Sequence, residues 1–151
     1  MIRPATLEDV PTIVAMARQF YPETHYVNWC DMDDGTVADL AANLAENHVM
    51  LVAELDGRIV GMVGLFIGPF LFNRDRLGAY EVVWWVAPEA RGSRVAASLL
   101  TAIEAPSRDK GASRIQMVHM PNSPPQAAAL YERFGYALSE VSYTKDINRD
   151  R

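Results

Sequence analysis

A short basic segment, Arg91 to Arg94, stands between a predicted strand and a predicted helix. The run that begins at Glu81 is apolar and rich in Val and Trp, which is typical of a strand buried on both faces, and Pro88 ends it near Ala87. The first N–H groups of a helix lack partners and lie at the positive end of its dipole, so this junction favours phosphate binding. The helix is predicted from apolar residues at helical spacing: Val95, Ala96, Ala97, Leu99, Leu100 and Ile103.

Two residues near this segment could exchange protons close to neutral pH. Glu81 stands among aromatic and aliphatic residues early in the predicted strand, so desolvation would raise the pKa of its carboxyl group. His119 is placed late in the neighbouring predicted strand and has an ordinary pKa of about 6.5. Each has a structural alternative, a strand-edge carboxylate for Glu81 and a satisfied core histidine for His119.

The N-terminal part of the chain predicts a short strand and two helices. Ile2 to Ala5 is compatible with a strand, and Thr6 precedes Asp9 in a capping arrangement that begins a helix ended by Pro22. A second helix is expected over Val37–Glu46. The aromatic and acidic loop between the helices, residues 23–35, is either a solvated connection or part of an acceptor pocket for a cationic amine. Its acidic spacing does not match a calcium loop.

The remaining segments predict a sheet. His48–Glu54 and Arg58–Phe66 form a hairpin around an Asp-Gly turn, and Asn73–Arg76 is expected to be a polar connection. Further along, we expect a strand, a helix and a last strand region, at Arg114–Met120, Gln126–Phe134 and Tyr136–Ile147 respectively. The order favours an α/β (α+β) fold with a mixed, mostly antiparallel central sheet flanked by helices on both faces, as a single domain over residues 1–151.

Composition narrows the classes of function. Half of the 151 residues are hydrophobic, 22% are charged and the net charge is -5, which fits a soluble protein and disfavours nucleic acid and anionic membrane as partners. The single cysteine, Cys30, excludes an internal disulfide, and His25, His48 and His119 are too far apart to suggest a metal site. With no signal-like or membrane-spanning run, we expect a cytoplasmic protein that binds no metal.

The residues around the basic segment resemble the acetyl-coenzyme-A loop of the GNAT superfamily of N-acetyltransferases. That loop reads Arg/Gln-x-x-Gly-x-Gly/Ala, and Arg91, Arg94 and Ala96 occupy its specified places, so an arginine replaces the middle glycine. The replacement either closes the backbone approach that glycine permits or adds a contact to the pyrophosphate. The resemblance covers nearly the whole chain, because IRPATLEDVPTI is similar to the family's opening, VAELDGRIVGMVGL to its hairpin and AALYERFGYA to its last helix.

This resemblance implies acetyl coenzyme A as co-substrate and a set of site residues. In the family, a backbone N–H beside a splay in the central strand, expected here near Trp85 to Ala87, polarises the thioester carbonyl. Tyr131 matches a tyrosine that often protonates the departing thiolate. Pro124 replaces the asparagine usually found seven residues earlier, and Asn122 is a candidate substitute. The implied coenzyme-binding residues are Trp85, Val86, Ala87, Arg91, Gly92, Ser93, Arg94, Val95, Ala96, Asn122 and Tyr131.

Acyl transfer to an amine requires a polarised carbonyl, a deprotonated amine and a leaving thiolate. We assign the base first to Glu81 and second to His119, and the acid to Tyr131. The sequence thus predicts an N-acetyltransferase that moves an acetyl group directly to a primary amine of a small molecule or protein. The alternative is a non-catalytic coenzyme-A-binding GNAT-like sensor or assembly module. A homodimer is a further possibility, because homodimers are frequent in the family.

Overall fold

The chain folds around one mixed β-sheet. In the computed structural model, which describes residues 1–148, the strand order is β1-β2-β3-β4-β5. Neighbouring strands are antiparallel except β4 and β5, which are parallel. The strands are β1 Ile2–Pro4, β2 Val49–Leu55, β3 Arg58–Phe70, β4 Asn73–Val86 and β5 Ala112–Gln116. The predicted mixed, mostly antiparallel sheet is confirmed.

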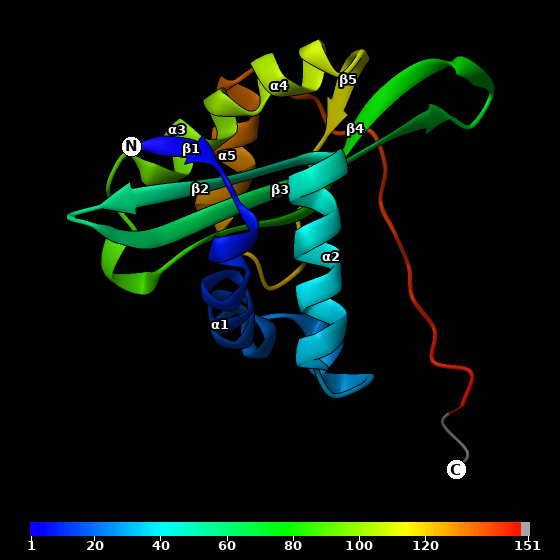
Figure 1. Ribbon diagram of the computed structural model, residues 1–151. Helices are drawn as coiled ribbons and strands as arrows, with labels where there is room; N and C mark the ends of the chain where they lie inside the picture. Colours follow the sequence, from blue (N-terminus) through cyan, green and yellow to red (C-terminus); the bar gives the residue numbers. More distant parts are fainter. Residues whose placement is uncertain (149–151) are drawn as a thin grey trace.

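Helices cover both faces of this sheet (Figure 1). On β3, Gly61 and Gly64 are three residues apart and therefore face opposite sides. Val95 and Leu99 of α3 lie beside Gly61, whereas Leu44 of α2 lies beside Gly64. Because α1 packs against α2, these two helices share one face and α3 lies on the other. The helices are α1 Val10–Phe20, α2 Asp34–Asn47, α3 Val95–Ala102, α4 Glu104–Asp109 and α5 Pro125–Arg133, with short 3-10 turns between some elements.

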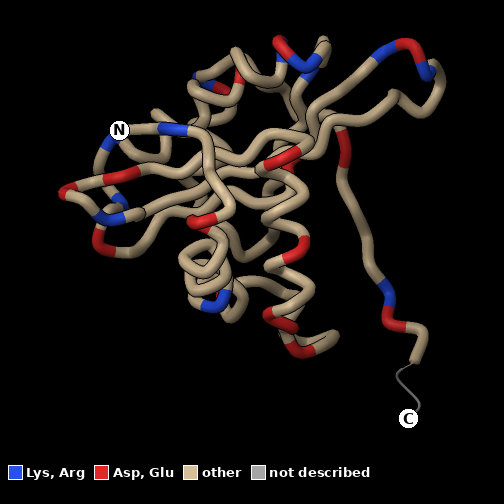
Figure 2. Tube along the Cα trace, in the orientation of Figure 1, with Lys and Arg blue, Asp and Glu red and all other residues tan. Residues whose placement is uncertain are grey.

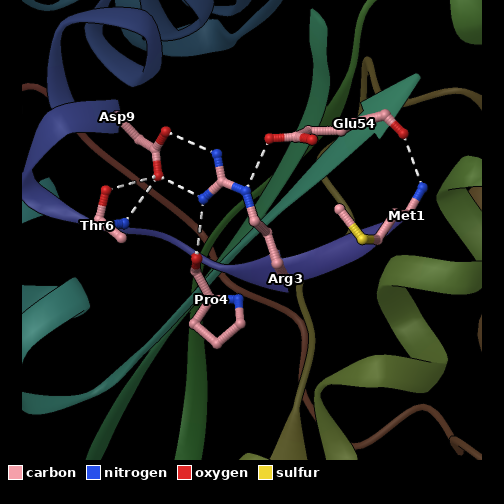
Figure 3. Close-up of polar contacts among 6 residues, drawn as sticks. All are labelled: Met1, Arg3, Pro4, Thr6, Asp9 and Glu54. Carbon is pink, nitrogen blue, oxygen red and sulfur yellow. Dashed lines mark hydrogen bonds and ion pairs between the residues drawn. The ribbon is translucent and has the colours of Figure 1, made fainter. Parts of the chain in front are cut away.

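An arginine at the N-terminus fixes α1 to the sheet (Figure 3). The Arg3 guanidinium donates two hydrogen bonds to Asp9, at 2.7 and 2.9 Å, and one to Glu54 of β2 at 2.8 Å. The Asp9 carboxylate also accepts the backbone N–H of Thr6 at 2.8 Å, as the predicted capping arrangement requires. The Arg3 guanidinium lowers the pKa of Asp9 to about 2. The first helix thereby starts from a defined point on β1 and β2.

The β2–β3 turn confirms the predicted Asp-Gly hairpin. Asp56 and Gly57 have φ angles of 52° and 76°, the left-handed region that such a two-residue turn needs at both positions. Strands β2 and β3 then pair from Leu55 with Arg58 back to Val49 with Leu65. These strands form the centre of the core, where Val52, Met62, Val63 and Leu65 are fully buried.

The polar connection predicted at Asn73–Arg76 is wrong, because these residues already belong to β4. Strands β3 and β4 continue beyond the sheet as a projecting two-stranded ribbon (Figure 1), with Leu71 and Phe72 at its exposed tip. Residues 73–76 are exposed, so they carry no apolar alternation that would mark a strand. In this part of β4, Asn73 pairs with Phe70 and Leu77 with Pro69, so residues 74–76 form an irregularity in the ribbon.

The strand region predicted over Tyr136–Ile147 is also wrong for the described residues. Gly135, at φ 88°, ends α5 as predicted, but the chain then leaves the sheet without pairing (Figure 1). Val141, Tyr143 and Ile147 alternate with polar residues and are exposed. An alternating pattern forms a strand only where a neighbouring strand covers its backbone and a core covers its apolar face. Separately, no helix within residues 1–148 is both long and apolar enough to cross a membrane.

Candidate functional site

The parallel strands β4 and β5 separate halfway along the sheet. Their pairing ends where Tyr80 meets Gln116, the last residue of β5. From Glu81 to Val86, β4 is therefore paired only with β3, and its other edge is open. This open edge, which we call the splay, contains the predicted positions Trp85 and Val86, with Ala87 directly after the strand.

A β-bulge at Val82 sets the direction of the side chains along the splay. Leu65 of β3 pairs with Glu81, but the preceding residue Gly64 pairs with Val83, so Val82 is the additional residue. In a regular strand, Glu81 and Val83 would share a face. The bulge instead places Glu81 toward α5, whereas Val83 faces α2. The bulge lies at the start of the splay, and the positions expected from the sequence, near Trp85 to Ala87, lie at its end.

Glu81 and Tyr131 lie together with the backbone of Val118 on the α5 side. The Tyr131 hydroxyl donates a hydrogen bond to the Val118 carbonyl at 2.8 Å, which ties α5 to the segment after β5. Burial raises the pKa of Glu81 to about 8, although polar contacts with Val118 and Tyr131 oppose this shift. Burial, together with the nearby Glu81 charge, also raises the pKa of Tyr131. The pair therefore combines a base that titrates near neutral pH with a phenol that stays protonated.

Two adjacent tryptophans line opposite faces of the splay, as their alternation along β4 requires. Trp84 stacks against Tyr131, with ring centroids 5.2 Å apart, and Trp85 packs against Phe20 of α1 at 6.4 Å. The Trp84 Nε1–H is buried and has no hydrogen-bond acceptor among the described residues. A buried donor without an acceptor is costly, so we expect a bound ligand or a water molecule to satisfy this N–H.

The basic segment forms the predicted junction between β4 and α3. Gly92 has a φ of 82°, and a side chain added there would meet nothing within 4 Å. Within residues 1–148, no acceptor is bonded to the backbone N–H groups of Gly92, Arg94, Ala96 and Ala97, while that of Val95 reaches only Ser93 Oγ at 3.3 Å. The loop therefore presents unpaired donors at the start of a helix, which is the donor set that a phosphate requires.

An open groove of about 570 Å³ runs beside this junction, between α3 and α5. Arg94 contributes to it from the loop and Arg133 from the last turn of α5, with small residues such as Ala97 and Ser98 between them. We call it the α3–α5 groove. The two guanidinium groups give it the charge that suits a phosphorylated ligand. Arg94, in place of the family's glycine, thus lines the groove.

Arg91 has a different orientation from that of Arg94. Its Nε donates to the Val86 carbonyl at 2.9 Å, and its Nη2 contacts both carboxylate oxygens of Glu23, at 3.0 and 2.9 Å. The Trp85 indole N–H also points to Glu23, at 3.4 Å. Asn122 donates its amide N–H to the Glu23 backbone carbonyl. Glu23 therefore ties the loop after α1 to the basic segment and to the chain after β5.

His119 is the sequence-based candidate that the structure sets apart. The sequence predicted His119 late in the strand. Strand β5 ends at Gln116, however, so His119 lies in the loop that follows it. It is exposed, and its Nε2 lies 3.4 Å from the Pro124 carbonyl. No contact joins it to Glu81 or Tyr131. Local alternation extended the predicted strand beyond the point where β4 and β5 separate.

A cavity of about 430 Å³ lies on the opposite side of β4, under α1 and α2. Most of its lining is apolar and comes from both helices and from β3 and β4, including Ala17, Ala41, Leu44, Met62, Val82 and Val83. The acidic and aromatic loop predicted to form an acceptor pocket contributes Tyr26, Cys30 and Asp31. We call this space the α1–α2 cavity. The bulge residue Val82 joins it to the splay.

Sequence reasoning missed three contributors to the site. Glu23 is 68 positions from Arg91, and no local pattern links two such distant charges. Arg133 is part of the last-helix motif AALYERFGYA, and its place at a helix C-terminus, where the dipole favours any cation, gave no signal for a ligand. The Val82 bulge depends on strand register, which apolar runs on both faces do not specify.

Comparison with known proteins agrees with this architecture. The model of the Acetyltransferase (GNAT) family matches residues 12–136. The chain therefore belongs to the GNAT acetyltransferase family, and this membership supports acyltransferase activity.

Solved structures with the same fold cover nearly all of the chain. A predicted acetyltransferase with acetyl-CoA from Clostridium acetobutylicum is 18% identical, with a TM-score of 0.75 over 99% of this chain and 97% of that one. A ribosomal-protein-alanine N-acetyltransferase from Brucella melitensis is 19% identical, with a TM-score of 0.72 over 97% and 99%. An aminoglycoside acetyltransferase from an uncultured soil metagenomic sample is 17% identical, with a TM-score of 0.71 over 98% of each chain. At these identities the likeness establishes the fold.

Proposed function

We propose that the protein is an acetyl-coenzyme-A-dependent N-acetyltransferase that transfers its acetyl group directly to a primary amine. The observation that carries this proposal is the placement of Glu81 and Tyr131 together at the splay, with unpaired N–H donors of the Gly92–Ala97 segment beyond it. A base, an acid and a phosphate site are the provisions that transfer from a phosphorylated thioester to an amine requires.

The donor set of this chain fits the coenzyme. The backbone N–H groups of Gly92, Arg94, Ala96 and Ala97 would hold the pyrophosphate, and Arg94 and Arg133 would line the path of the outer phosphates. The open edge of β4 offers unpaired backbone groups to an extended amide-containing arm, and Trp84 Nε1–H adds one donor. When bound, acetyl coenzyme A supplies the acetyl group as a thioester.

The chain's own residues then move the protons. The ionised Glu81 carboxylate accepts a proton from the acceptor ammonium, and the freed nitrogen forms the new C–N bond as the C–S bond breaks. Tyr131 donates its phenolic proton to the leaving sulfur, and the second proton shed by nitrogen restores the phenol. The net reaction releases one proton. With a pKa of about 8, roughly one Glu81 in ten is ionised at pH 7, so activity should rise with pH.

Thermal unfolding with acetyl coenzyme A, ADP and pantetheine is the first test. Ligand at about 100 times its dissociation constant adds about 2.7 kcal/mol, which raises Tm by roughly 5 to 10 °C for a domain of this size. Thiol release in the presence of an amine then tests transfer. A Tm shift without amine-dependent thiol release would favour the non-catalytic sensor, and no shift in the folded protein would refute both functions.

A further inference from the structure

The α1–α2 cavity offers a ligand mainly apolar surface, because most of its polar lining groups are already paired. The Tyr21 hydroxyl donates to backbone carbonyls of Tyr26, at 3.0 Å, and Cys30. Thr24 Oγ1 donates to the Tyr21 carbonyl at 2.7 Å and accepts the Tyr26 N–H at 3.2 Å. A polar substituent placed against the buried apolar part of the lining, at Ala41, Leu44 and Met62, would lose hydration without finding a partner.

On the α2 side of the cavity, polar groups are also paired within the protein. The Thr36 hydroxyl donates to Asp33 at 2.7 Å, and the same carboxylate oxygen accepts the Thr36 N–H at 2.8 Å to cap α2. Asp31 is different, because no hydrogen bond or ion pair engages it among the described residues. Acidic positions gather at this end of α2 (Figure 2). Asp31 is exposed to solvent, which screens its charge, so the interior of the cavity is defined by its apolar lining.

The loop that bounds the cavity is held in place from outside. Glu23, next to Thr24, is bonded to Arg91 on the basic segment, and its backbone carbonyl accepts the Asn122 amide. These contacts join the cavity wall to elements on the other side of the splay. A cavity with fixed walls selects a ligand by shape with little ordering cost.

The cavity also reaches the reacting edge of β4. Val82 and Val83 form part of its lining, and the neighbouring Glu81 lies on the other face because of the bulge. A group that extends from the cavity past Val82 arrives at the splay from the α1–α2 side. Its volume of about 430 Å³ is within the usual range of small-molecule pockets.

We propose that the acceptor is a primary amine with an apolar alkyl or aryl substituent, and that this substituent occupies the α1–α2 cavity. The inference rests on the proposed acetyltransferase function. The substituent packs between Ala17 of α1 and Ala41 of α2, and the amino group extends past Val82 to the splay. Acceptors with hydroxyl groups or further charges in place of the apolar substituent should react more slowly, because the buried apolar part of the lining offers those groups no partner.

The test is a series of amines of nearly equal basicity, namely ethylamine, butylamine and hexylamine, with 2-phenylethylamine as the aryl member. Ethanolamine and putrescine are the polar comparators. The expected kcat/KM for thiol release rises about fourfold per buried methylene and exceeds the values of both comparators. A flat series, or a preference for putrescine, would overturn the proposal even if acetylation is rapid.

Variants that fill the cavity localise the effect. Ala41→Leu should reduce kcat/KM for hexylamine at least tenfold and leave ethylamine within twofold, with acetyl-coenzyme-A affinity unchanged. Ala17→Leu repeats the test from the opposite wall if Ala41→Leu fails to fold. The matched control is Ala42→Leu, one position along α2 and outside the cavity lining. Equal losses for hexylamine and ethylamine in both cavity variants would contradict the assignment.

A binding measurement separates this inference from the proposed function. Titration calorimetry of hexylamine into the protein saturated with coenzyme A should give binding that Ala41→Leu weakens about tenfold. Hexylamine binding without thiol release from any amine would refute acetyl transfer and support the cavity assignment. Turnover of other amines, with no hexylamine binding, would support the transferase and refute the apolar acceptor.

Discussion

The two faces of the sheet carry surfaces of opposite character on either side of one strand. The α3–α5 groove is open and is lined by Arg94, Arg133 and small residues, whereas the α1–α2 cavity is more enclosed and largely apolar. The first suits a phosphorylated ligand and the second an apolar one. Between them, β4 presents Glu81 toward one face and Val82 toward the other. Under the proposed function, two chemically unlike substrates would approach from opposite faces and react at the splay.

Removal of the proposed base should have the largest effect. Glu81→Gln is expected to lower kcat for thiol release by about 10²-fold to 10⁴-fold, because the amine then loses its proton acceptor. The wild-type rate should rise with an inflection near pH 8, and the variant should lack this inflection. Unchanged acetyl-coenzyme-A affinity in Glu81→Gln, and unchanged kcat in the exposed control Glu46→Gln, would show that the loss of kcat comes from the Glu81 carboxylate. If Glu81→Gln keeps the inflection near pH 8, the inflection belongs to another group.

The same variant should alter the pH dependence of stability. The Glu81 pKa is raised from 4.5 to about 8 on folding, so between these pH values the folded chain holds a proton that the unfolded chain has lost. The contribution of Glu81 to stability is therefore complete below pH 4.5 and is lost as pH rises to about 8. The free energy of unfolding, measured with urea from pH 5 to 8, should decline less steeply for Glu81→Gln than for the wild type.

Loss of the Tyr131 hydroxyl is expected to have the next largest effect. Tyr131→Phe should lower kcat roughly tenfold to a hundredfold, because no positioned acid protonates the leaving sulfur. Contact with Tyr131 lowers the pKa of Glu81, so the inflection of the pH profile should also move upward. Tyr143→Phe, in the exposed C-terminal segment, is the matched control. An unaltered inflection would show that the two groups do not interact.

Loss of a positive charge from the α3–α5 groove should weaken binding of the coenzyme and leave binding of the amine unchanged. Arg94→Ala and Arg133→Ala are each expected to weaken acetyl-coenzyme-A binding by about 1 to 3 kcal/mol, without a change in KM for the amine. Calorimetry at two salt concentrations should show a smaller salt dependence for each variant. Arg58→Ala, on the β2–β3 hairpin, controls for the loss of net charge. An equal effect on amine KM would contradict the separation of the two faces.

The smallest effect is expected when the Glu23–Arg91 ion pair, which joins the loop after α1 to the basic segment, is disrupted. Glu23 and Arg91 are both about 39% exposed, so Glu23→Gln should raise KM for both substrates only about twofold to fivefold. In a double-mutant cycle with Arg91→Ala, the losses should not add, because Arg91 acts through Glu23. Asp34→Asn breaks the exposed Arg18 pair as a control. Additive losses would mean that Arg91 binds the coenzyme directly.

Local sequence features predicted most turns and helices of the site, but not which way their side chains point or which distant residues they contact. Asp56-Gly57, Gly135 and the apolar spacing from Val95 to Ile103 each determine their own turn or helix, and the structure contains each of them. Glu81 was predicted as a base from its apolar neighbours, and its raised pKa agrees with that reasoning. His119 was misplaced because the strand predicted at Arg114–Met120 ends at Gln116, and no strand forms over Tyr136–Ile147, because alternation does not reveal where a segment has no partner strand.

The sequence by itself determined the Asp56-Gly57 hairpin, the strand-to-helix junction at Arg91–Arg94 and the apolar neighbours of Glu81, because each depends on residues within a few positions of one another. Tyr131 was assigned through the family resemblance. Only the tertiary structure decided that Val82 bulges, that Arg91 turns to Glu23 and that Arg94 and Arg133 share a groove. These outcomes depend on strand register and on contacts between residues far apart in the chain. The free energies involved arise only when the sheet and both helix layers assemble.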